Sequence, residues 1–173
     1  MLSLPIHACT RTVLVHPHYP ENVGAAARAI KTMGFAELVL VKPGRLAVPE
    51  HEMARKMAVK SLDVLEAAVR HATLRDAVGS DRLVLAATSR RGVSGVHSPR
   101  VAAVRAVEHA ARGGRVAVVF GNEKTGLDQT DLQLADVLVR IPMAADQPSL
   151  NLAQAVQVLA YELLVAGLAA RAG

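Results

Sequence analysis

The stretch RVAVVFGNEKTGLDQTD, residues 115–131, joins a short apolar run to a polar loop that contains two glycines. Every residue from Val116 to Phe120 is apolar, with no alternation between apolar and polar positions. A strand that is buried on both faces of a sheet has this pattern, as in parallel sheets covered by helices. Four further runs are similar, at 12–16, 37–41, 82–87 and 136–141. The sequence therefore predicts a mostly parallel sheet.

Helical patterns occupy the segments between these runs. They are expected over 21–34, 51–71, 73–78, 98–114 and from 152 onward. In the first of them Asn22 is predicted as the N-cap and Gly34 as the C-terminal stop, and the second is predicted to break near Ser61. Strands that alternate with helices predict an α/β fold, a mostly parallel sheet flanked by helices. No linker or internal repeat interrupts the pattern, so we expect a single domain over residues 1–173.

Composition and charge narrow the function classes. The formal net charge of +5 and the sequence pI of about 9.9 suit an anionic partner such as RNA, and they suit a mildly basic soluble protein equally well. Only 2% of the residues are aromatic, which argues against base stacking on exposed aromatic platforms. The single cysteine, Cys9, excludes an intrachain disulfide. Neither a convincing signal peptide nor an uninterrupted membrane-spanning run is present, so a cytoplasmic protein without a membrane segment is expected.

Loops that follow strands are the candidate ligand sites, because open α/β sheets bind ligands beyond the carboxyl ends of their strands. After the run at 82–87, Thr88 and Ser89 offer hydroxyl groups, and Arg90 and Arg91 suit a phosphate. A solvated turn explains these four residues equally well. After the run at 115–120, two glycines bracket a tight turn that holds Glu123 near the strand end, although the Walker A ending is missing.

The loops after the first and the last run are ambiguous on their own. Asn22 opens a helix and Arg28 follows six residues later, so the two side chains do not share a helical face. The G-x-G-x-x-G pattern is absent there, which argues against a small dinucleotide-binding oxidoreductase. No third ligand accompanies the histidines at 16 and 18, so no metal is expected. Ser149 and Asn151 precede the last helix, where a plain helix cap also explains them.

Three segments taken together carry a family resemblance. NVGAAARAIKTMGF (22–35), VFGNEKTGL (119–127) and IPMAADQPSLNLAQAVQVLAYEL (141–163) resemble, in order and spacing, the three motifs of the SPOUT-class RNA 2′-O-methyltransferases. The similarity spans roughly residues 12–165. It is greatest to the TrmJ-like branch of the TrmH superfamily, and the third motif is its most specific part.

The resemblance implies an α/β domain with a C-terminal trefoil knot, a rare exception to the rule that chains are not knotted. It implies S-adenosylmethionine as cofactor and a homodimer with the first and last helices at the interface, each site being completed by the other subunit. The implied cofactor contacts are Ala87, Thr88, Ser89, Gly121, Ile141, Pro148, Ser149 and Leu150. No metal is needed, because the sulfonium is already a strong electrophile.

The resemblance also implies residue roles and a substrate. The implied catalytic residues are Arg28, Glu123, Ser149 and Asn151, and the candidate RNA contacts are Asn22, Arg28, Arg90, Arg91 and Lys124. Because a guanidinium stays protonated, we expect Arg28 to stabilise a phosphate or the developing alkoxide rather than to accept the proton. The chain is close in size to minimal family members that methylate the tRNA wobble position, so tRNA, in its anticodon-loop region, is favoured over rRNA. The alternative is a catalytically silent RNA-binding or assembly protein of the same fold.

Overall fold

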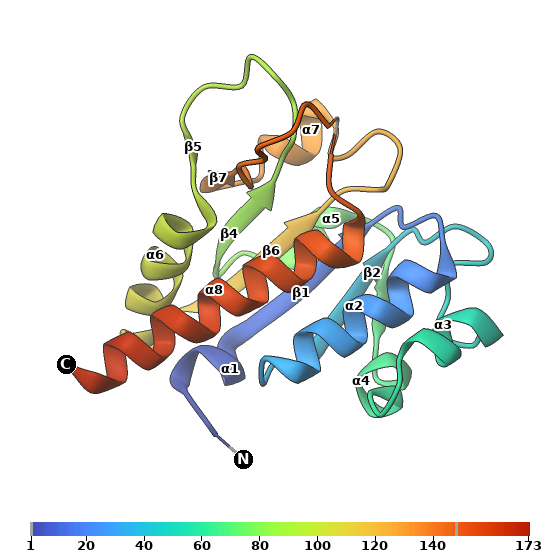
Figure 1. The fold of residues 1–173 in the computed structure, drawn as a ribbon, viewed down its shortest axis with the longest axis horizontal. Coiled ribbons are helices and arrows are strands. Elements are labelled where there is room, and N and C mark those ends of the chain that lie inside the picture. Colours follow the sequence, from blue (N-terminus) through green and yellow to red (C-terminus); the bar gives the residue numbers. More distant parts are fainter. Residues whose placement is uncertain (1, 148) are drawn as a thin grey trace.

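A seven-stranded sheet in the order β3-β2-β1-β6-β4-β7-β5 forms the centre of the protein (Figure 1). All of its strand pairs are parallel, as predicted. The structure is a computed structural model that describes residues 2–147 and 149–173. The strands are β1 Thr10–Val15, β2 Glu37–Val41, β3 Val69–His71, β4 Arg82–Ala87, β5 Val96–His97, β6 Arg115–Phe120 and β7 Val137–Val139.

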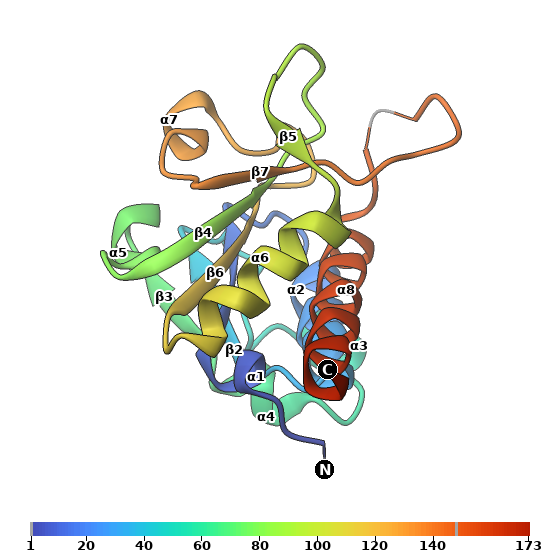
Figure 2. The same cartoon turned by 90° about the vertical axis from the view of Figure 1, so that its left-hand side faces the viewer.

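Helices cover both faces of this sheet, which confirms the predicted class (Figures 1 and 2). They are α1 Pro5–Cys9, α2 Pro20–Thr32, α3 Glu52–Met57, α4 Leu62–Glu66, α5 Leu74–Val78, α6 Pro99–Ala111, α7 Gln129–Leu132 and α8 Leu152–Ala172. Successive strand residues point to opposite faces: Leu14 joins the core under α2, α6 and α8, whereas Val13 and Val15 join the core under α5 and α7. Both faces of the central strands are therefore apolar, as the uniform runs indicated.

The longest helix, α8, packs beside α2 and α6 along one face of the sheet (Figure 1). Leu152, Val156, Leu159 and Leu163 recur at helical spacing and are buried. By length and apolar composition alone α8 could cross a membrane, although its polar interruptions argue against this. Helices that pack on the core of soluble proteins can have the same composition, and one face of α8 is buried between α2 and α6.

Several predicted boundaries are wrong. The runs 12–16 and 136–141 correspond to β1 Thr10–Val15 and β7 Val137–Val139, and two helical segments also differ. The N-cap of α2 is Tyr19, not Asn22, because Pro20 takes the first helical position, where its fixed φ angle and missing N–H are favourable. The segment 51–71 does break at Ser61, the N-cap of α4, but its last residues form β3 instead of continuing the helix. Pairing between Val39 and Val69 adds β3 to the edge of the sheet.

The strand order places two groups of strand ends along one edge of the sheet. From β1 the chain builds β2 and β3 on one side, while β6, β4, β7 and β5 lie on the other. Ligands of open α/β sheets bind beyond the carboxyl ends of the strands, near such a reversal of strand order. The loops after β4 and β7 extend beyond this edge together (Figure 2). The trefoil knot in this region stays a prediction.

Candidate active site

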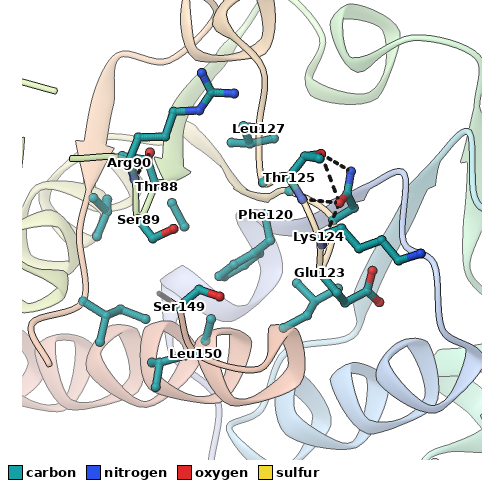
Figure 3. A pocket seen from close by; sticks show the side chains of 18 of the residues that line it. Thr88, Ser89, Arg90, Phe120, Glu123, Lys124, Thr125, Leu127, Ser149 and Leu150 are labelled. Carbon is teal, nitrogen blue, oxygen red and sulfur yellow. Dashed lines mark hydrogen bonds between the residues drawn. The ribbon is translucent and has the colours of Figure 1, made fainter. Parts of the chain in front are cut away.

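A cavity of about 200 Å³ lies at the carboxyl ends of β4, β6 and β7 (Figure 3). Three separate loops supply its walls, and Figure 3 shows their labelled side chains arranged around the buried Phe120. The lining residues are Ala87, Thr88, Ser89, Arg90, Phe120, Gly121, Asn122, Glu123, Lys124, Thr125, Gly126, Leu127, Val139, Ile141, Met143, Ser149, Leu150, Leu152 and Ala155. Segments far apart in sequence thus meet in one place because their strands are neighbours.

The first wall is the turn after β4. The backbone N–H of Thr88 donates to the carbonyl of Val139 at 2.9 Å, which continues the pairing between β4 and β7. The Thr88 hydroxyl accepts a hydrogen bond of 3.2 Å from the backbone N–H of Arg90, and its side chain is buried. Ser89 and Arg90 follow it and are exposed. This turn therefore presents a hydroxyl group and a guanidinium at the edge of the cavity.

The second wall is the loop after β6. The Asn122 side-chain oxygen accepts hydrogen bonds from the backbone N–H groups of Lys124, at 2.9 Å, and Thr125, at 2.8 Å. Gly126 has a φ angle of 67°, a left-handed conformation that suits glycine. At Gly121 a Cβ atom would lie 2.1 Å from the carbonyl carbon of Gly126. Glycine at 121 is therefore required by this turn.

A chain of hydrogen bonds links the three motif segments. The Glu123 carboxylate accepts hydrogen bonds from the backbone N–H groups of His18, at 2.9 Å, and Tyr19, at 3.2 Å. It also accepts one of 2.9 Å from the side-chain amide of Asn22. The Asn22 oxygen in turn accepts a hydrogen bond of 2.9 Å from the Asn151 amide. The Asn151 oxygen then caps α8, at 2.9 Å from the N–H of Ala153.

These hydrogen bonds differ from the roles that were predicted for Asn22 and Glu123. Asn22 is 8% exposed, and both ends of its amide group bind protein atoms, so the geometry does not support the predicted contact between Asn22 and RNA. Glu123 uses both carboxylate oxygens to hold the residues that begin α2. A carboxylate near a helix N-terminus is favourable, because unpaired N–H groups carry partial positive charge there. Asn22 and Glu123 therefore hold the start of α2 against the loop after β6 and the start of α8.

The basic residues predicted to contact RNA lie in different parts of the structure. Arg90 and Lys124 line the cavity, whereas Arg91 lies outside it in an exposed ion pair with Asp146. Arg28 lies in the middle of α2, exposed and outside the cavity lining. Within the described residues its guanidinium forms no hydrogen bond or ion pair.

The predicted cofactor residues, by contrast, converge. All of them line the cavity except Pro148, which lies outside the described residues. Within residues 2–147 and 149–173, no three His, Cys, Asp or Glu side chains are grouped so that they could hold a metal ion.

Several lining residues escaped the sequence reading. Phe120 and Val139 are the last residues of β6 and β7, so their position at strand ends indicates that they can line a ligand site. Asn122 organises its loop through an Asx-type turn, for which the sequence N-x-x-T is a weak local signal. Nothing in the sequence indicated that Leu152 and Ala155, in the first turns of α8, also face the cavity.

Comparison with known proteins agrees with this arrangement. The chain is 42% identical over 163 residues to the tRNA (cytidine/uridine/adenosine-2′-O-)-methyltransferase TrmJ of Pseudomonas aeruginosa (strain UCBPP-PA14). That alignment covers 93% of this chain and 62% of the relative, so the chain spans under two thirds of the relative's length.

Solved structures share the fold. A probable methyltransferase from Bordetella pertussis Tohama I superposes with a TM-score of 0.88 at 39% identity, covering 94% of this chain and 97% of that one. A structure concerned with the 2-OH methylation of C/U34 on tRNA gives 0.74 at 26% identity, covering 94% and 97%. The model of the SpoU rRNA methylase family matches residues 10–161. These likenesses confirm the resemblance seen in the three motifs: the chain belongs to the SpoU rRNA methylase family.

Proposed function

We propose that this protein transfers a methyl group from S-adenosylmethionine to a ribose 2′-hydroxyl of tRNA, in the anticodon-loop region. The observation that carries the proposal is the hydrogen-bonded chain Glu123–Asn22–Asn151, which joins the three family motifs beside a cavity at the strand ends. The relative from Pseudomonas aeruginosa is named as a tRNA 2′-O-methyltransferase, which supports the choice of tRNA. We assign this activity to a single domain spanning residues 1–173.

The cavity suits a nucleoside-containing cofactor. Thr88 and Gly121 line it, and the backbone of Gly126 approaches Gly121 so closely that no side chain fits at position 121. Apolar residues such as Leu127, Ile141 and Leu150 supply the surface for an adenine ring. When bound, S-adenosylmethionine supplies a methyl group on a sulfonium. Its contacts would be the predicted ones at 87–89, 121, 141 and 149–150. Pro148, the remaining predicted contact, lies outside the described residues.

The chain's own residues then orient the acceptor and help its proton leave. In-line transfer needs the ribose oxygen to be held against the methyl group. Ser149, at the cavity wall, orients the ribose. Asn151, exposed at the start of α8, contributes the second N–H of its amide nitrogen, since the first donates to Asn22 and its oxygen caps the helix. Lys124 and Arg90 hold the neighbouring phosphates through charge-assisted hydrogen bonds. Arg28 stabilises the developing alkoxide, which lowers the cost of deprotonation.

Arg28 acts in the site of a partner subunit in this proposal. Its helix shows an outward stripe at Glu21, Ala25, Arg28 and Thr32, and it lies beside α8. On α8, Tyr161 is 52% exposed, Val165 37% and Leu168 41%, although these side chains are apolar or aromatic. A homodimer that buries this surface would bring Arg28 of one subunit towards the cavity of the other. We infer a cytoplasmic location, where tRNA is available.

Methyl transfer tests this directly. Purified protein with methyl-labelled S-adenosylmethionine and unfractionated tRNA should yield 2′-O-methylnucleosides, identified by mass spectrometry after nuclease digestion. Arg28→Ala should abolish labelling while the calorimetric affinity for the cofactor changes less than about twofold, because the guanidinium lies outside this subunit's cavity. Arg112→Ala, at the exposed end of α6, is the matched control and should label tRNA normally. An equal loss of cofactor binding in Arg28→Ala would show that the assigned role is wrong.

The same assay separates the alternatives. The family description names rRNA, so rRNA is the second substrate to be tested. Labelling of rRNA but not of tRNA would replace the proposed substrate while leaving the reaction in place. Binding of tRNA without any labelling would identify a catalytically silent RNA-binding protein.

A further inference from the structure

A second cavity, of about 560 Å³, lies at the carboxyl ends of β1, β2 and β3. The first cavity lies at the ends of β6, β4 and β7, whereas this one lies on the β1, β2 and β3 side of the sheet. No sequence motif predicted it. Its lining residues are Val15, His16, Val41, Lys42, Ala72, Thr73, Leu74, Arg75, Asp128, Thr130, Asp131, Gln133 and Leu134. Its volume falls within the range of about 300–1,000 Å³ that is typical of small-molecule sites.

The linings of the two cavities are adjacent in the sequence at two places. His16 lines the second cavity, and His18, two residues later, donates to Glu123 in the lining of the first. The loop after β6 likewise lines the first cavity as far as Leu127, and Asp128 begins the lining of the second. Both cavities therefore lie at the carboxyl edge of the same sheet, and their linings adjoin at Leu127 and Asp128.

Two strand ends in this second cavity have an unusual backbone. His16 has a φ angle of 50° and Lys42 one of 42°, left-handed values that are uncommon for residues other than glycine. Their strands are neighbours, and hydrogen bonds hold both residues: the N–H of His16 donates to Val41 at 2.8 Å and that of Lys42 to His71 at 3.1 Å. Backbone outliers of this kind cluster at ligand sites. Here both occur in the lining of one cavity.

The charges of this cavity suit a nucleotide. Lys42 and Arg75 are exposed, and among the described residues neither side chain has an ion-pair partner, so both are available to a phosphate. Asp131, Gln133 and Thr130 offer hydrogen-bonding groups to a base or ribose. Burial raises the pKa of the Asp131 carboxyl, and the nearby Asp128 carboxylate adds to the rise. Asp128 itself caps α7, at 2.8 Å from the N–H of Asp131.

We propose that this second cavity binds one nucleotide of the RNA, near the methylated ribose, with its phosphate at Lys42 and Arg75 and its base towards Asp131 and Gln133. The inference rests on the proposed function, because it extends the path of that same RNA substrate. It adds RNA contacts to those proposed for Arg90 and Lys124 at the cofactor cavity. Substitutions in the second cavity should accordingly weaken RNA binding without changing cofactor affinity.

The test uses a substitution that leaves the backbone unstrained. Asparagine tolerates left-handed φ angles, so Lys42→Asn removes the charge and keeps the turn. We expect the dissociation constant for unfractionated tRNA, measured by filter binding, to rise about fivefold to tenfold. The slope of log affinity against log salt concentration should fall by about 0.7 to 0.9 for a lost phosphate contact. The calorimetric affinity for S-adenosylmethionine should stay within about twofold of the wild-type value.

Lys60→Asn is the matched control, because Lys60 is also an exposed lysine with a positive φ angle, 57°, but lies outside both cavities. It should bind tRNA as the wild type does, and Lys42→Arg should retain most of the affinity. Arg75→Gln gives a second, independent variant on α5. If both Lys42→Asn and Arg75→Gln bind tRNA with wild-type affinity and salt dependence, while the wild type labels tRNA, the second cavity is not an RNA site. If the wild type labels no RNA, the proposed function fails and this inference with it.

Discussion

Glu123 shows at the scale of one residue how a sequence motif becomes geometry. Its carboxylate accepts hydrogen bonds from the segment that opens α2, from residues 101 to 105 positions earlier in the chain. The sequence predicted that Glu123 sits near a strand end, which is confirmed. Its partners were not predictable, because no local pattern reports a contact across more than 100 residues. In this contact Asn22 binds Glu123 from within the first turn of α2 instead of capping the helix.

Replacing the Glu123 carboxylate distinguishes a positioning role for this residue from a role as the base that accepts the proton. In Glu123→Gln an NH2 group replaces one carboxylate oxygen and faces N–H donors of the segment that begins α2. Because two donors cannot bond to each other, we expect a loss of about 1–3 kcal/mol in the free energy of unfolding. Urea denaturation measures it. Glu21→Gln, in the first turn of the same helix, is the matched control and should change stability by less than about 0.5 kcal/mol. Residual methyl transfer by Glu123→Gln should keep the wild-type pH profile; a lost limb of that profile would instead identify Glu123 as the base.

At the scale of the element, the loop after β6 depends on a glycine at its first position. A Cβ atom on Gly121 would lie 2.1 Å from the carbonyl carbon of Gly126, so Gly121→Ala must displace backbone atoms of the turn. We expect the calorimetric affinity for S-adenosylmethionine to fall at least about tenfold, because the turn forms a wall of the cavity. Gly173→Ala, at the C-terminal end of α8, is the control, because no atom lies within 4 Å of the added Cβ there. Unchanged cofactor affinity in Gly121→Ala would remove this turn from the binding site.

The elements also show where sequence reading is strong and where it fails. Long apolar runs such as 115–120 were predicted correctly, because a strand buried on both faces needs an apolar residue at every position. Strands β3 and β5 have three and two residues and were missed. Pairing with a neighbouring strand defines them, β3 with β2 and β5 with β7, and their own short sequences carry no strand pattern.

At the scale of the whole molecule, the sheet class followed from the alternation of apolar runs and helical patterns, whereas the strand order did not. That order is set by which strands pair, and it places the ends of β4, β6 and β7 around one cavity. The predicted cofactor residues in the described chain meet there because of it. The second cavity was beyond reach of the sequence, since its lining comes from four short segments without a shared motif.

The exposed apolar face of α8 gives a prediction at this scale. If Tyr161, Val165 and Leu168 lie in a subunit contact, a charge there is buried without a partner in the dimer and solvated in the monomer. Tyr161→Asp should therefore halve the mass measured by light scattering and abolish methyl transfer. Val104→Asp is the matched control, because Val104 is a similarly exposed residue on α6, and its mass should equal that of the wild type. A wild-type protein that is monomeric at micromolar concentration would contradict the homodimer.

The hydrogen-bonded chain from Glu123 through Asn22 to Asn151 has an evolutionary consequence. Each amide group in it donates to one neighbour and accepts from another, so a change at a single position leaves a donor or an acceptor without its partner. Viable substitutions should then arise as compensating sets. Among relatives that share this fold, these three positions should covary, and a lineage that loses one of them should lose the polar character of the other two.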